Sequence, residues 1–381
     1  MPPRPQRPSP VRAVRRLAGP SARPLALALL AAALGCGGAG GPVQFGMAGP
    51  FTQGFGTANR RGAELAVAEI NAAGGIGGDS LSLRFEDDSG DGTRAAMLAQ
   101  GFVDDAAISA VVGHVTSGAM LAAAKVYDGH LPAIATTASS ADLTGISPWA
   151  FRVISSDSAN GVDLARFAER LGKKRAAILY ENDSYGRGLA DAFRRSFGGE
   201  VISLDPIDYD GARSALHLEW LQPRAPDLIF VAGTEQTGMA ILREAKRRKL
   251  TADLLGGDGW TGVVADAAAA EGAYVGAPFT ALDPRPEAQR FVQAYTARFG
   301  EEPDGNAALA YDAVKLLAAA VEAVGRDRTR IRDWLAQRAE RGAFPGVTGP
   351  IAFDANGDPV GKSFTMTRIA AGRLTVAEGG R

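Results

Sequence analysis

The sequence predicts an α/β protein whose parallel sheets are divided between two lobes. From residue 43 onward, short apolar runs alternate with amphipathic stretches, which is the pattern of repeated strand–helix units. The 345 residues that follow position 36 also exceed what one hydrophobic core usually holds. No period of about 20 to 50 residues repeats, which argues against a solenoid.

Strands are expected where apolar residues cluster between turn signals. The first occupies 43–47, and the second shows the alternation of Leu81, Leu83 and Phe85 that is typical of a half-buried strand. The remaining strands are expected at 110–112, 133–135, 176–180, 201–204, 228–232 and 254–255.

Helices are expected where apolar residues recur at helical spacing. One such stripe consists of Ala63, Leu65, Val67 and Ile70, and the pair Gly74-Gly75 ends it. Further helices are expected at 161–171, 188–197, 237–248, 287–299 and 307–324. Because two long helices and a strand-like tail at 350–369 follow the last clear strand–helix unit, we expect the chain to cross between the lobes more than once.

The first 36 residues have the composition of an export signal. Six arginines and no acidic residue precede the apolar run 25–34, which is too short to span a bilayer. The residues Ala33-Leu34-Gly35-Cys36 resemble a bacterial lipobox, so we expect cleavage before Cys36, lipidation of its thiol and a glycine-rich tether at 37–42. The alternative is a plain cleaved signal peptide with an incidental cysteine.

The composition of the remaining chain limits its partners. Without the six leader arginines, 35 basic residues stand against 42 acidic ones, and this acidic balance argues against nucleic acid or an anionic membrane surface as a partner. Since Cys36 is the only cysteine, no intrachain disulfide can form, and stability must come from buried apolar area.

The usual catalytic and metal-binding motifs are missing from the sequence. Its three histidines lack metal-ligand spacing, and no G-x-S-x-G, H-E-x-x-H or Walker A motif occurs. The aspartates of 87–92 open like a calcium loop, but the twelfth position is Leu98, which cannot supply a bidentate carboxylate. We interpret 87–92 as a turn and helix cap, and we expect neither a metal nor a cofactor.

Three loops that follow predicted strands carry the chemistry of a binding site. Ligands of open parallel sheets bind beyond the carboxyl ends of the strands. The loop 113–118 places hydroxyl groups and backbone N–H groups at a helix start, which suits a carboxylate. The loop 136–140 adds further small donors, and in 256–260 the carboxylate of Asp258 is flanked by glycines and lies near Trp260.

Several collinear motifs carry a resemblance that spans essentially all of the chain from Val43 onward. They include Met47-Ala48-Gly49-Pro50 and Asn182-Asp183-Ser184-Tyr185-Gly186. The others lie at 62–66, 70–76, 113–118, 310–314 and 346–351. In order and spacing these motifs resemble the type I periplasmic binding proteins of the leucine/isoleucine/valine class.

The resemblance implies two Rossmann-like lobes with parallel-sheet cores, joined by a three-segment hinge and closing on a ligand in the cleft between them. We expect the first lobe to comprise 43–155 plus 281–344 and the second to comprise 156–280 plus 345–381. The hinge segments are expected near 154–156, 279–281 and 344–346.

The resemblance also implies roles for individual residues. Ser117 and Ser139 match the hydroxyl residues that hold an amino acid's carboxylate, whereas the carbonyl of Ala138 and the carboxylate of Asp258 match its ammonium partners. Three aromatic residues are expected at the ligand, namely Tyr185 from the second lobe, Phe55 in place of a familiar tyrosine, and Trp260. Asp258 replaces a glutamate and Thr234-Glu235 replaces an aromatic pair, so this part of the site departs from the family's pattern.

These observations predict a lipid-anchored solute-binding protein of the periplasm or cell surface, not an enzyme. It would capture an amino acid or similar small polar solute by cleft closure and deliver it to the permease subunits of an ABC importer. One alternative is a ligand-sensing receptor module for an amide or small carboxylate that is not coupled to transport. An enzyme is the third option, although no nucleophile and base pair is visible.

Overall fold

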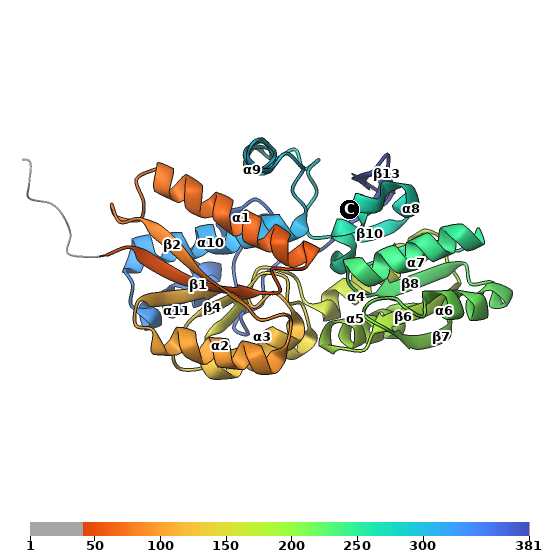
Figure 1. Ribbon diagram of the computed structural model, residues 1–381, viewed down its shortest axis with the longest axis horizontal. Helices are drawn as coiled ribbons and strands as arrows, with labels where there is room; N and C mark the ends of the chain where they lie inside the picture. Colours follow the sequence, from red (N-terminus) through yellow and green to blue (C-terminus); the bar gives the residue numbers. More distant parts are fainter. Residues whose placement is uncertain (1–40, 381) are drawn as a thin grey trace, which may run out of the picture. The chain divides into compact units, whose positions relative to one another are not determined.

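The computed structural model describes residues 41–380 of the chain. The predicted leader, the lipidation site Cys36 and the first part of the tether lie outside the described residues. Within the described part, no helix combines the length and the apolar character needed to cross a membrane. Two sheets and one short two-stranded ribbon organise this part of the chain (Figure 1).

The first sheet has five parallel strands in the order β2-β1-β3-β4-β5. Their bounds are β1 Val43–Gly49, β2 Leu81–Asp87, β3 Ile108–Val112, β4 Ala133–Ala135 and β5 Ala150–Arg152. Because the chain starts in the middle of the sheet and extends to both sides, the strand order reverses between β1 and β3. Such a switch point opens a crevice at the carboxyl ends of the strands.

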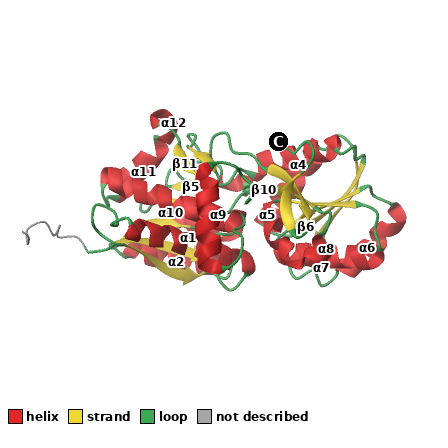
Figure 2. Ribbon diagram, turned by 90° about the horizontal axis from the view of Figure 1, so that it is seen from above, coloured by secondary structure: helices red, strands yellow, loops and turns green. Residues whose placement is uncertain are grey.

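Helices cover both faces of the first sheet (Figure 1). On one face, α1 and α10 pack on Phe45, Met47 and Val112, and α9 lies beside them (Figure 2). On the other face, α2 and α3 bury Phe102 and Tyr127. The bounds of the helices are α1 Gly54–Ala72, α2 Gly92–Asp104, α3 Ser117–Tyr127, η1 Ala141–Leu143, α9 Pro286–Phe299, α10 Gly305–Val324, α11 Arg328–Ala336 and α12 Arg338–Arg341.

The second sheet has seven strands in the order β14-β13-β10-β9-β8-β6-β7, of which β13 and β14 are antiparallel additions at one edge. The bounds are β6 Arg175–Glu181, β7 Glu200–Ile207, β8 Leu228–Ala232, β9 Asp253–Gly256, β10 Tyr274–Ala277, β13 Thr365–Ala370 and β14 Arg373–Val376. This order reverses between β6 and β8, so a second crevice forms at the carboxyl ends of these strands.

Two helices bury apolar residues against one face of the second sheet, and the other helices belong to a separate apolar cluster on the opposite face. The first pair is α4 Asp157–Arg170 and α5 Ser184–Ser196, which pack around Phe193 and Phe230. The others are α6 Ser214–Leu221, α7 Glu235–Arg248, η3 Asp258–Asp266 and α8 Ala267–Ala270. The short η2 Gln222–Arg224 follows α6 and buries no residue. The prediction of two lobes with parallel-sheet cores is therefore confirmed.

All eight expected strands are present, but β5 and β10 were not expected. They have three and four residues, and strands this short show no period in the sequence, although β4 and β9 are equally short and were found as apolar runs. The tail expected at 350–369 comprises the end of the ribbon β11 Phe344–Gly346 and β12 Gly349–Ile351, an irregular stretch, and β13. The interpretation of 87–92 as a turn and cap is confirmed, because the side chain of Asp91 accepts from the backbone N–H of Arg94 at the start of α2.

The chain passes between the two sheets three times, at 153–156, 278–285 and 360–364. The residues before the third passage contact the first sheet, since the N–H of Arg152 donates to the carbonyl of Gly357 over 3.1 Å and its Nε donates to Asp358 over 2.6 Å. The third hinge segment is expected from the sequence near 344–346. We propose instead that the first lobe extends to about residue 359.

The contact between α1 and α10 depends on a glycine. A β-carbon on Gly62 would lie 2.0 Å from the carbonyl oxygen of Ala307, so the two helices approach too closely for any side chain there. Alanine normally stabilises a helix relative to glycine by about 1 kcal/mol. We expect Gly62→Ala to do the opposite and to lower the free energy of unfolding by about 1–3 kcal/mol, because overpacking forces the helices apart.

Urea denaturation of Gly62→Ala tests this expectation. Gly101→Ala in α2 is the matched control, because the nearest atom to its new β-carbon would be 3.9 Å away. The control should be as stable as the wild type or more so. Equal stability of the two variants would contradict the proposed close contact.

Candidate functional site

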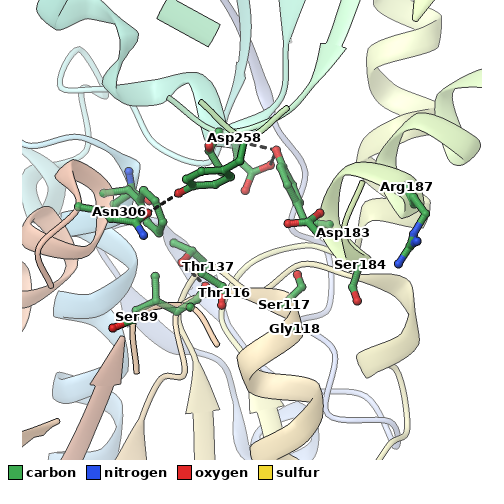
Figure 3. Close-up of a pocket in the computed structure, with 18 residues that line it drawn as sticks. Ser89, Thr116, Ser117, Gly118, Thr137, Asp183, Ser184, Arg187, Asp258 and Asn306 are labelled. Carbon is green, nitrogen blue, oxygen red and sulfur yellow. Dashed lines mark hydrogen bonds between the residues drawn. The ribbon is translucent and has the colours of Figure 1, made fainter. Parts of the chain in front are cut away.

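A cavity of about 520 Å³ lies between the carboxyl ends of the parallel strands in the first sheet and those in the second. Figure 3 shows the residues that line it. With the exception of Asn306 at the start of α10, each lining residue belongs to the segment that follows a parallel strand. The first lobe contributes Gln53, Phe55, Ser89, Gly90, Val115, Thr116, Ser117, Gly118, Thr137 and Asn306. The second lobe contributes Asp183, Ser184, Tyr185, Arg187, Tyr209, Thr234, Asp258 and Gly259.

On the side of the first lobe, the start of α3 faces the cavity. The hydroxyl oxygen of Ser117 accepts from the N–H of Ser140 over 3.1 Å, which joins α3 to the loop after β4. The hydroxyl of Thr137 donates to the carbonyl of Val115 over 2.8 Å and joins the same two segments again. Because the first N–H groups of a helix have no partner within it, this end suits an anionic group.

The loop after β4 is also held from behind by Arg152, the last residue of β5. Its guanidinium is 2% exposed and donates to the carbonyl oxygens of Ser139 and Ser140 over 2.9 and 2.7 Å. The same group donates to Asp358 and to the hydroxyl of Thr144. Arg152 therefore fixes the loop that carries two of the predicted ligand contacts, Ala138 and Ser139.

On the side of the second lobe, Asp258 faces the cavity from the start of η3 (Figure 3). The hydroxyl of Tyr185 donates to Oδ1 of Asp258 over 3.0 Å and accepts from the N–H of Gly259 over 3.1 Å. Burial raises the pKa of Asp258 to about 6, and the hydrogen bond from Tyr185 opposes that rise. This carboxylate can pair with a cation that enters the cavity.

The structure brings most of the predicted site residues together. Phe55, Ser117, Tyr185 and Asp258 line the cavity. Ala138 and Ser139 are fully buried in the loop behind the lining.

Trp260, which was expected at the ligand, is fully buried in the core of the second lobe. A β-carbon on Gly256 would lie 2.1 Å from its ring, so the glycine makes room for the tryptophan. Trp260 therefore packs in the core of the second lobe and does not line the cavity.

Sequence reasoning missed several polar lining residues, among them Gln53, Tyr209 and Asn306. Two of the missed residues join the lobes across the cavity, because the hydroxyl of Tyr209 donates to the side chain of Gln53. Beside them, the side-chain amide of Asn306 donates to the hydroxyl of Thr261 over 3.2 Å. The signal for Gln53 and Tyr209 was their place just after β1 and β7, which no short motif marks.

A cavity enclosed by two parallel-sheet lobes, with a helix start on one side and a carboxylate on the other, defines a two-lobed solute-binding protein. The family model described as "Periplasmic binding protein" matches residues 42–373. The chain belongs to the periplasmic binding protein family, in its type I leucine/isoleucine/valine class, which consists of extracytoplasmic binding proteins and not of enzymes.

Individual relatives agree with this assignment over nearly the whole described chain. An "Amino acid binding protein" of Pseudomonas aeruginosa is 30% identical over 337 residues, which cover 83% of this chain and 87% of the relative. The "Leu/Ile/Val-binding protein homolog 2" of Brucella abortus is 28% identical and covers 85% and 89%. A substrate-binding protein of a branched-chain amino acid transporter from Streptococcus pneumoniae, solved with isoleucine, has a TM-score of 0.82 at 32% identity and covers 88% and 99%.

The hydrogen bond between Tyr185 and Asp258 should affect the ionisation of the Asp258 carboxylate. Because the phenol donates to the carboxylate, it favours the ionised form, and its removal by Tyr185→Phe should raise the pKa of Asp258 above its value of about 6. The carboxyl ¹³C shift of Asp258, followed against pH, measures the change. Tyr127→Phe is the control, since the Tyr127 hydroxyl contacts His114 within the first lobe. If both variants leave the titration of Asp258 unchanged, the hydrogen bond does not affect its charge.

Proposed function

We propose that this protein captures an amino acid in the cavity between its lobes. The observation that carries the proposal is the placement of Asp258 in the second lobe opposite the helix start at Ser117 in the first (Figure 3). The two ends of this arrangement match the ammonium and carboxylate groups of a zwitterion. The names of the relatives from Pseudomonas aeruginosa and Brucella abortus, and the isoleucine bound to the protein from Streptococcus pneumoniae, support the same class of ligand.

The proposed headgroup contacts come from both lobes. Ser117 and the N–H groups of α3, with Ser139 behind them, would hold the carboxylate, and the carbonyl of Ala138 together with Asp258 would hold the ammonium. Phe55 and Tyr185 would form part of the wall around the ligand. Ligand binding drives closure only through contacts that exist in the closed form alone, and Asp258 and Tyr185 supply these because they belong to the second lobe.

The proposal includes delivery to the permease subunits of an ABC importer and attachment to a membrane through a lipid on Cys36. The transporter class named for the protein from Streptococcus pneumoniae supports delivery. Attachment rests on the lipobox-like sequence that ends at Cys36.

Calorimetry on two variants tests the proposed ligand. A thermal-shift screen of the standard amino acids first identifies a binder, since a ligand at 100 times its dissociation constant stabilises the fold by about 2.7 kcal/mol. Asp258→Ala should then weaken binding at least about tenfold, because a hydrogen bond to a charged group contributes roughly 1.5–3 kcal/mol. Ser117→Ala should weaken binding less, since the backbone N–H groups of α3 remain.

The opposite ranking would overturn the proposed headgroup. If Asp258→Ala binds as tightly as the wild type while Ser117→Ala does not, no ammonium sits at Asp258. The absence of any amino-acid binder, together with binding of a plain carboxylate such as benzoate in the same screen, would replace the amino acid by a carboxylate as the ligand.

Fractionation of cells that express Cys36→Ser tests the anchor. The variant should move from the membrane fraction to the soluble fraction while its ligand affinity stays unchanged, because Cys36 precedes in sequence all the residues that line the cavity. Wild-type protein is the control for the membrane fraction. Unchanged membrane association of Cys36→Ser would show that the cysteine is not the attachment site.

A further inference from the structure

The wall of the cavity beyond the proposed headgroup site is polar. Among the described residues that line the cavity, Phe55 and Val115 are the only two with wholly apolar side chains, and Gly90, Gly118 and Gly259 have none. Every other lining residue carries a hydroxyl, an amide or a charged group. Pockets for small ligands are usually lined predominantly by hydrophobic and aromatic side chains. This wall therefore differs from one that would enclose an aliphatic side chain.

The amide of Gln53, the residue that precedes α1, has donors to offer a ligand. Its Oε1 accepts a hydrogen bond from the hydroxyl of Tyr209 in the second lobe. Its Nε2 has no hydrogen-bond acceptor among the residues that the structure describes. Gln53 lines the cavity and is only half-buried, so the two N–H groups of Nε2 remain available to a bound molecule.

The amide of Asn306, at the start of α10, has the complementary group. Its Nδ2 donates to Oδ2 of Asp304 over 2.8 Å and to the hydroxyl oxygen of Thr261 over 3.2 Å. Both N–H groups of this amide are therefore engaged, and they fix its orientation. Its Oδ1 accepts no hydrogen bond within the described chain, although Asn306 lines the cavity (Figure 3). An unused acceptor and the unused donors of Gln53 thus belong to two helices of the first lobe that pack against each other.

The charged lining residues lie away from Asn306. Asp258 belongs to the proposed headgroup site, and Figure 3 shows Arg187 on the side of Asp258 opposite to Asn306. Arg187 and Asp183 are both exposed at the start of α5, and their charges are opposite in sign. Gln53 and Asn306 therefore present hydrogen-bonding groups that carry no charge of their own.

An aliphatic side chain of the ligand would leave these groups without partners. When the lobes close, water leaves the cavity wall, and a buried donor or acceptor that loses water without gaining a partner is costly. A side-chain amide avoids this cost, because its carbonyl can accept from the N–H groups of Gln53 and its N–H groups can donate to the oxygen of Asn306. Sites built to hydrogen-bond a ligand reject analogues that lack the group far more strongly than apolar pockets reject an added group.

We propose that Gln53 and Asn306 select the side chain of the ligand, so that the protein prefers amino acids with a side-chain amide, asparagine or glutamine, to aliphatic ones. This inference rests on the proposed function and deepens it. It would set this chain apart from the Brucella abortus relative named for leucine, isoleucine and valine. Because Gln53 also contacts Tyr209 of the second lobe, recognition of the side chain is coupled to contact between the lobes.

Calorimetry on the wild type with two matched pairs of probes tests the preference. Asparagine and leucine have nearly the same shape, as do glutamine and methionine, and all four share one headgroup. The difference within a pair therefore reports the contacts of the side chain alone. We expect at least one of the two amides to bind about tenfold or more tightly than its apolar counterpart.

A variant of Gln53 tests which residue carries the preference. Gln53→Met keeps the length of the side chain and removes its hydrogen bonds. It should reduce the ratio of amide to apolar affinity at least about fivefold, because only the amide loses a partner. A general effect on closure would weaken both members of a pair equally and leave the ratio unchanged. Gln100→Met, at an exposed position of α2, is the control and should change neither affinity.

The outcomes separate the two proposals, and the wild-type pairs decide the preference even if Gln53→Met does not fold. If leucine and methionine bind to the wild type as tightly as asparagine and glutamine do, the inference fails, although the proposed function stands. Tightest binding of lysine or arginine overturns it as well, because the wall would then select a charge. An unchanged ratio in Gln53→Met would show that Gln53 does not recognise the side chain. If no amino acid binds to the wild type at all, the proposed function fails and this inference fails with it.

Discussion

The guanidinium of Arg152 is the group on which the geometry of the cleft depends most. It is buried, and it donates at once to the carbonyls of Ser139 and Ser140 and to the carboxylate of Asp358. These contacts join the end of β5, the loop after β4 and the returning chain before its last passage between the lobes. Since a buried charge without its partners is strongly destabilising, Arg152 fixes the positions of these three segments relative to one another.

Buried acidic groups lie near the segments that Arg152 holds together. Asp157 and Asp258 cost free energy in the empty protein, because burial disfavours their ionised forms. The fold keeps them in place through the packing of α4 and α5 and through the hydrogen bond from Tyr185. A cation bound beside them would offset this cost.

The sequence predicts the fold and part of the site because both follow from local patterns. Apolar runs mark β1, β6 and β8, and the rule that ligands bind beyond the carboxyl ends of parallel strands selects the loops with Ser117 and Asp258. Arg152 could not be found in this way, since its importance comes from burial and from partners distant in sequence. Trp260 was misplaced because a core aromatic and a lining aromatic look alike until Gly256 is known to make room for the ring.

The two ends of the described chain lie in different lobes. β1 is a central strand of the first sheet, whereas β14 is the edge strand of the second. Any rotation of one lobe against the other therefore changes the separation between the beginning of β1 and the end of β14. Fluorescent proteins fused near these two points would turn the binding protein into an optical sensor for its solute, with no label inside the cleft.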